Sequence, residues 1–180
     1  TANLEAYQAS GDALFSDTAR ETLDYIVREL EAPQGGFISA TDADSPGADG
    51  KREEGLFFTW TPGEFQSVLG QGDARIASLA YGATPQGNLN GRSVLRNELT
   101  TSELAKQLRR PVDEAAMDLA DIRRRLYAAR SKRPPPLRDD KIIVSWNALA
   151  ISALARGAIA FGHEPYEAAA VRAAARLMAP

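Results

Sequence analysis

The sequence predicts a mainly α-helical protein that is built from antiparallel helical hairpins. Three observations lead to this fold class: apolar residues recur at helical spacing along most of the 180 residues, a glycine-centred pattern occurs twice, and strand-like segments are few and short. Hydrophobic residues make up 44% of the chain and charged residues 25%, which excludes a disordered or fibrous protein. The length fits one domain with a sizeable core.

Helical patterns and helix-end patterns account for most of the chain. Residues 14–31 and 111–132 each place apolar side chains on one face, and Thr61–Glu64 and Thr100–Glu103 have the sequence of capping boxes. Residues 143–161 are apolar nearly all round, which predicts a helix that is buried on most sides. The full set of expected helices covers residues 1–10, 14–31, 61–70, 73–81, 100–109, 111–132, 143–161 and 165–178.

Two segments look like strands. Residues 36–40 and 56–60 are short, rich in aromatic and β-branched residues, and flank a polar loop with several glycines. We expect them to pair as a small β-hairpin that is inserted into the helical fold.

An internal repeat is centred on Gly11 and Gly162. Each glycine follows an apolar helix, and a second helix with matching aromatic and alanine positions begins about three residues later. The repeat predicts helical hairpins at 1–31 and 143–178, each with a tight glycine turn. Repeated hairpins are typical of an α-solenoid or a closed α/α toroid, and the long segments at their other end are the usual place for a site.

Composition removes several function classes. The chain has no Cys and one His, which excludes disulfides, thiolate metal sites and a multi-His mechanism in this segment. A net charge of −3 disfavours nucleic acid as the main partner. With no apolar run approaching 18 residues, we expect no membrane-spanning helix, and we expect a cytoplasmic protein. Both ends read as mid-helix sequence, so we expect a piece of a longer protein.

Three motifs, in this order and spacing, carry a family resemblance. They are GGFISATDADS at 35–45, EGLFFTWTP at 54–62 and DDKIIVSWN at 139–147. The chain resembles the thioredoxin-domain-containing family of spermatogenesis-associated protein 20 and its bacterial relatives. The resemblance implies that residues 1–180 are a partial (α/α)6 toroid with a small β-hairpin insertion. It would consist of a hairpin at 1–31, an insertion with short helices at 32–110, a helix at 111–132 and a hairpin at 143–178.

The resemblance also suggests a carbohydrate-active domain, a hydrolase or an isomerase whose substrate is a sugar. Helix direction places the loop 35–60 and the segment 139–147 at the same end of the hairpins, so we expect them to form one site. We predict Asp42, Asp44 and Asp140 as catalytic carboxylates, and Trp60, Lys141, Trp146 and Asn147 as sugar-binding residues. No cofactor and no metal are expected.

Other interpretations of the same residues stay open. The two aspartates of the loop are also typical of Asx turns, and Asp140 favours a helix N-terminus in any helical protein. Asp42, Asp44, Gly47 and Glu53 have calcium-loop spacing, but Pro46 and strand-like flanks argue against it. Basic residues gather in 109–141, where alternating charges favour a solvated helix face over a nucleic-acid site.

A non-catalytic toroid is the alternative function. Such a toroid would be a scaffold or a ligand-binding module that partners an upstream thioredoxin-like domain. The remaining toroid hairpins are then further partners, and a chain that lacks them would expose apolar helix faces and self-associate.

Overall fold

The computed structural model describes residues 1–47 and 50–179. It is mostly helical and divides into two compact units. Unit 1 combines both ends of the sequence, Thr1–Thr41 and Arg138–Pro180, and unit 2 is the intervening segment Asp42–Leu137. The mainly helical class is therefore confirmed, while the closed toroid stays a prediction.

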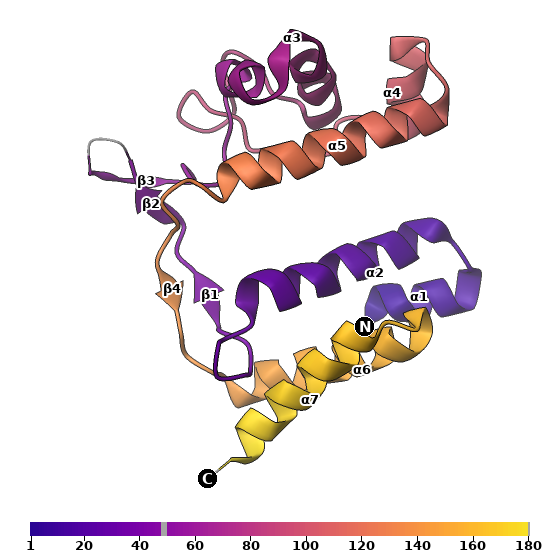
Figure 1. Ribbon diagram of the computed structural model, residues 1–180, viewed down its shortest axis with the longest axis vertical. Helices are drawn as coiled ribbons and strands as arrows, with labels where there is room; N and C mark the ends of the chain where they lie inside the picture. Colours follow the sequence, from indigo (N-terminus) through magenta and orange to yellow (C-terminus); the bar gives the residue numbers. More distant parts are fainter. Residues whose placement is uncertain (48–49, 180) are drawn as a thin grey trace. The chain divides into compact units, whose positions relative to one another are not determined.

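Unit 1 consists of two antiparallel helical hairpins (Figure 1). The first pairs α1 (Ala2–Ser10) with α2 (Ala13–Tyr25), which continues into a π-helical turn, η1 (Ile26–Leu30), and the second pairs α6 (Val144–Phe161) with α7 (Glu164–Met178). The turns at Gly11 and Gly162 have φ of 69° and 60°, the left-handed region that glycine enters without strain. The repeat read from the sequence therefore predicted both hairpins.

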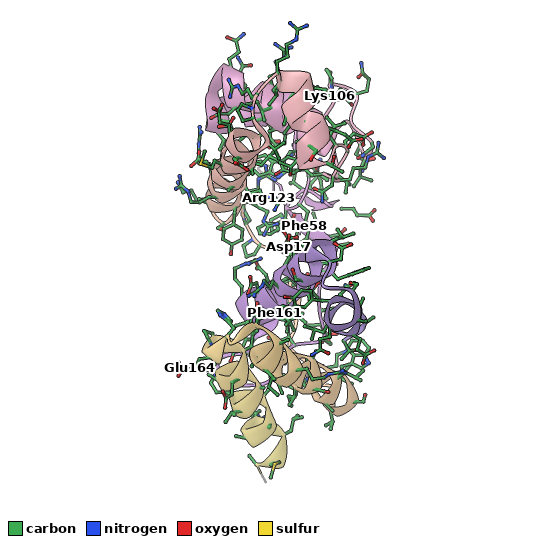
Figure 2. The ribbon with its side chains drawn as sticks, turned by 90° about the vertical axis from the view of Figure 1, so that its right-hand side faces the viewer. Asp17, Phe58, Lys106, Arg123, Phe161 and Glu164 are labelled. Carbon is green, nitrogen blue, oxygen red and sulfur yellow. The ribbon has the colours of Figure 1, made fainter. Side chains whose placement is uncertain are left out.

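The core of unit 1 lies between these hairpins. Leu23 of α2 and Leu154 of α6 are buried there with small residues of α7, and the alanines of α7 let its backbone approach α6 closely. Phe161, labelled in Figure 2, lies beneath the guanidinium of Arg20 at 3.8 Å from the ring centre. Its ring is also 5.8 Å from that of Tyr7, so the end of α6 is attached to the first hairpin.

Unit 2 packs two helices against a third (Figure 1). The helices are α3 (Pro62–Tyr81), α4 (Thr101–Leu108) and α5 (Val112–Arg130), with a core around Phe65, Leu104 and Ile122. Helix α3 is kinked at Gly70, where φ is 79° and ψ is 169°, so it contains both predicted helices of that region. Both predicted capping boxes, at the starts of α3 and α4, are confirmed.

The strands differ from those expected. In unit 2, β2 (Asp44–Pro46) pairs with β3 (Arg52–Glu54), and in unit 1, β1 (Ala40–Thr41) pairs with β4 (Arg138–Asp139); both pairs are antiparallel. The predicted pairing of 36–40 with 56–60 is wrong. Residues 56–59 instead form a turn in which the carbonyl of Gly55 accepts hydrogen bonds from Phe58 and Thr59, and Trp60 pairs with Ser93.

Helix α6 is more exposed than its sequence predicted. Trp146, Leu149 and Ile159 are 56%, 70% and 84% exposed, so the prediction of a helix buried on most sides is wrong for unit 1. The helix packs against α1, α2 and α7, and these contacts leave the three side chains exposed. Among the described residues, α6 is long and apolar enough to cross a membrane by length and composition alone, so the expectation of no membrane-spanning helix stays a prediction. Core helices of soluble proteins have the same length and composition.

Candidate functional site

The loop 35–39 and the segment 139–147 meet at the N-terminal end of α6. The backbone N–H and the hydroxyl of Ser39 both donate to the carbonyl of Asp139, at 3.2 and 3.1 Å. The short β1–β4 ladder continues this contact. The first part of the motif at 35–45 and the motif at 139–147 are therefore brought together inside unit 1.

The side chain of Asn147 holds the loop in this position through hydrogen bonds. This side chain is almost fully buried, and Oδ1 accepts from the backbone N–H of Phe37 at 2.6 Å. Its Nδ2 donates to the carbonyls of Phe37 at 2.9 Å and Ile143 at 3.1 Å. The amide thus satisfies a buried backbone N–H and C=O in place of a sheet partner. Asn147, predicted to bind a sugar, is engaged here in positioning the loop.

Trp146 lies one residue earlier and points away from the core. It borders a groove of about 390 Å³ between α1, α2 and α6, and a smaller pocket of about 120 Å³ against Phe37, Ile38 and Ser39. The groove is mainly apolar, with Thr22 and Ser152 among its polar members. An exposed indole beside an apolar groove can stack on the flat face of a ring-shaped ligand.

The three charged residues before α6 have different environments. The ammonium of Lys141 lies 3.0 Å from Oδ2 of Asp139, and this hydrogen bond is the main cause that holds the pKa of Asp139 below its usual value. Asp140 is exposed, and its ion-pair partner Arg138 is 3.6 Å away. Of these residues, Asp140 is the carboxylate that is most open to a ligand.

Asp42 and Asp44 lie in unit 2. Asp42 Oδ2 accepts from Arg52 at 2.8 Å, and its Oδ1 accepts from the backbone N–H of Asp44 at 3.2 Å, which is an Asx-turn arrangement. Their approach to Asp140 stays a prediction. Within residues 1–47 and 50–179 no group of three or more His, Cys, Asp or Glu side chains is arranged to hold a metal ion. Positions 48 and 49 of the calcium-loop pattern lie outside that description.

Trp60 is 3% exposed and belongs to the core of unit 2. Its ring lies 5.6 Å from that of Phe65 and 4.0 Å from the guanidinium of Arg133. Arg133 also donates to the carbonyls of Leu56, Phe57 and Thr59 at 2.7 to 3.2 Å. The EGLFFTWTP motif is therefore held in shape by an arginine.

Glu64 joins this arginine to a second one. Its carboxylate lies 2.7 Å from Arg92 and 3.3 Å from Arg133, and it closes the capping box on Thr61. Burial raises the pKa of Glu64. The hydrogen bonds from Arg92 and Thr61 and the two positive charges lower it by more than burial raises it, so the pKa lies below the usual 4.5. A pocket of about 560 Å³ lies beside Trp60, Glu64 and Arg133.

Sequence reasoning missed this cluster. Arg92 and Arg133 are separated from Glu64 by 28 and 69 positions, and no local pattern marks either of them. The capping box identified Glu64 only as a helix-capping residue. A half-buried carboxylate whose remaining lone pairs need partners was the one signal available.

Fold and site define a class: a helical-hairpin protein with an exposed tryptophan groove at the loop end of its hairpins. No protein-family model matches the chain. It is 33% identical to human spermatogenesis-associated protein 20, in a match that covers 84% of this chain and 22% of the relative. The mouse protein of that name is 32% identical, with 94% and 24% covered. An uncharacterised protein of Caenorhabditis elegans is 31% identical, with 72% and 20% covered.

These similarities support the spermatogenesis-associated protein 20 family that the three motifs indicated. The chain spans less than a quarter of the length of these relatives.

Proposed function

We propose that this chain is a sugar-binding segment of a protein related to spermatogenesis-associated protein 20, and that Trp146 is its stacking platform. The observation that carries the proposal is the 56% exposure of Trp146 beside an apolar groove. An apolar aromatic face gains little from water, so exposure at a pocket edge favours a ligand with a flat apolar face. Pyranose rings have such a face, and their hydroxyls suit Ser39, which lines the smaller pocket together with Trp146.

The proposed reaction is hydrolysis or isomerisation of the bound sugar in the whole protein, within an (α/α)6 toroid that follows a thioredoxin-like domain. Asp140 is the best-supported of the three proposed carboxylates, because it is exposed and loosely paired. Asp42 would have to leave Arg52 before it could act as an acid or a base. A cytoplasmic location stays a prediction.

A direct binding experiment tests the proposal. Isothermal titration of the chain with glucose, mannose and N-acetylglucosamine should detect binding of at least one of them, and Trp146→Ala should weaken it about tenfold through the lost stacking. Ile159→Ala is the matched control, since it removes an exposed apolar side chain from the same helix outside the groove. Equal affinities in wild type and Trp146→Ala would refute the proposal.

A second candidate is a non-catalytic scaffold. The observation in its favour is that the exposed apolar residues of α6 extend well beyond the groove, to Ile159 near the end of the helix. A surface of this kind is typical of a contact with other protein segments. Two results together would favour the scaffold. The chain would bind none of the sugars in the panel, and its low solubility alone would be corrected by co-expression with the upstream domain.

The nucleic-acid alternative has little support in unit 2. Arg110 pairs with Asp118, and Arg125 pairs with both Asp73 and Asp121, so many cations of the basic stretch are already neutralised. A nucleic-acid surface needs cations that can meet phosphates.

A further inference from the structure

A polar pocket lies on unit 1 beside the loop that precedes Phe37. It measures about 550 Å³ and is bounded by the loop 32–35, strand β4 with the residues after it, and the last turn of α7. Its charged members are Arg138, Asp140 and Arg176. The volume is within the range of small-molecule sites, roughly 300–1,000 Å³.

The arginines of unit 1 divide into two groups. Four of the six have a close partner: Arg20 lies over Phe161, and Arg28, Arg156 and Arg172 form ion pairs with Glu29, Glu5 and Glu31 at 2.7 to 3.0 Å. The other two, Arg138 and Arg176, both line the polar pocket. Among the described residues, the fold therefore collects in one pocket the arginine with only a long 3.6 Å ion pair, Arg138, and the arginine with no ion pair, Arg176.

The charge of the pocket is not balanced. Arg138 Nε lies 3.6 Å from Asp140 Oδ1, too far for a hydrogen bond, and Arg176 forms no ion pair with the described residues. Glu31 stands next to the loop, but both of its oxygens accept from Arg172, at 2.7 and 3.0 Å. Two guanidinium groups and one carboxylate leave a net charge of +1, and the repulsion between the two cations is relieved by an anion.

The wall of the pocket is fixed before a ligand arrives. At Gly35, where φ is +85°, a Cβ would lie 3.0 Å from the carbonyl oxygen of Arg172, so the loop packs directly on α7. Its carbonyl and N–H groups at Ala32 are bonded to Gly35 and Gly36 within the loop. Binding would thus cost little reorganisation of the backbone.

We propose that this pocket binds the phosphate group of a small, soluble phosphate monoester. The planar guanidinium groups of Arg138 and Arg176 offer paired N–H donors that match phosphate oxygens, and a dianion gains most from a site with two cations. The carboxylate of Asp140 accepts a hydrogen bond from a hydroxyl of the attached organic group. The inference rests on Arg138 and Arg176, which line neither of the pockets beside Trp146, and only Asp140 is common to it and the proposed sugar reaction.

Isothermal titration of the whole chain with inorganic phosphate, glucose 6-phosphate and glucose tests this site. Both phosphates should bind, glucose 6-phosphate more tightly, and Arg138→Gln and Arg176→Gln should each weaken binding about tenfold. Asp140→Asn should strengthen binding of inorganic phosphate about two- to fivefold, because it removes a repelling charge. Arg75→Gln is the matched control, since it removes an exposed cation from unit 2.

All three substitutions in unit 1 are of exposed side chains, so circular dichroism should show an unchanged helical fold. The absence of phosphate binding by the wild-type chain would overturn the inference, and so would unchanged affinity in an Arg138→Gln Arg176→Gln double variant. Glucose binding that depends on Trp146 but not on the arginines would leave the sugar proposal intact while this one failed.

Discussion

At the scale of single residues, Asn147 connects the motif at 139–147 to the loop at Phe37. Replacing it with Ala leaves the N–H and C=O of Phe37 buried without partners. We expect Asn147→Ala to lower the free energy of unfolding by about 2–4 kcal/mol, since each unsatisfied buried group costs about 1–3 kcal/mol. Urea denaturation followed by circular dichroism measures the loss.

Hydrogen exchange at the Phe37 amide distinguishes local from global effects of this change. The amide should exchange much faster in Asn147→Ala, while Ser145→Ala, an exposed change in the same helical turn, should leave it protected. An unchanged Phe37 amide would contradict the positioning role of Asn147.

Glu64 gives unit 2 a defined pH dependence. Its pKa in the folded chain lies below the value of about 4.5 in the unfolded chain. The stability that it contributes is therefore present above that pH and is lost as the pH falls through the folded-state pKa. Glu64→Gln should destabilise unit 2 by about 1–2 kcal/mol at pH 7, and its difference from wild type should shrink as the pH falls below about 4.

The fluorescence of Trp60 reports unfolding of unit 2 in this experiment, because Trp60 is buried in the core of that unit. Glu53→Gln, an exposed change on strand β3, should give an unfolding curve close to that of wild type. A constant gap between Glu64→Gln and wild type from pH 7 to pH 3 would rule out the ion pairs as its cause.

At the scale of elements, replacing two glycines by alanine should change the stability of the chain in opposite directions. A Cβ meets nothing within 4 Å at either Gly162 or Gly72, so packing plays no part. Gly162 has φ of +60°, and Gly162→Ala should cost about 1–2 kcal/mol. Gly72 is helical in α3, and Gly72→Ala should stabilise by up to about 1 kcal/mol. Urea midpoints that shift in the same direction would contradict this explanation.

Helices were predictable from the sequence because their signals are local. The Gly11 and Gly162 turns and the two capping boxes each lie within a few residues, and all are confirmed. The strands were not, because glycine turns at 35–36 and 55 redirect the chain just where aromatic residues suggested extension.

The candidate site, like the fold, was predictable only where its signals are local. Helix direction correctly brought 35–39 to 139–147, since both flank hairpins of known polarity. The same reasoning could not tell that Asn147 faces the loop and Trp146 the solvent, because adjacent residues on a helix differ by about 100° in direction. The Glu64 cluster depends on contacts across tens of residues, which no local pattern records.

At the scale of the whole molecule, the exposed face of α6 should drive association with a second copy of the chain. Leu149 and Ile159 are 70% and 84% exposed. Burying this apolar area against another chain is favourable, so it drives association. Sedimentation velocity should show an apparent mass that rises with concentration. Leu149→Glu with Ile159→Glu should weaken association at least about tenfold, whereas Met117→Glu, an exposed change on α5, should not. A wild-type chain that stays monomeric at all concentrations would contradict this prediction.

The division of unit 1 between the two ends of the sequence has a consequence for its synthesis. Helices α1 and α2 leave the ribosome early, but their core partners Leu154 and Tyr166 come after the whole of unit 2. At about 5–20 residues per second, the roughly 100 intervening residues take on the order of 5–20 seconds to translate. During that interval the apolar side of α2 lacks its core partners from α6 and α7. The nascent chain can therefore be bound by chaperones for that limited time, until α6 and α7 emerge and cover this surface.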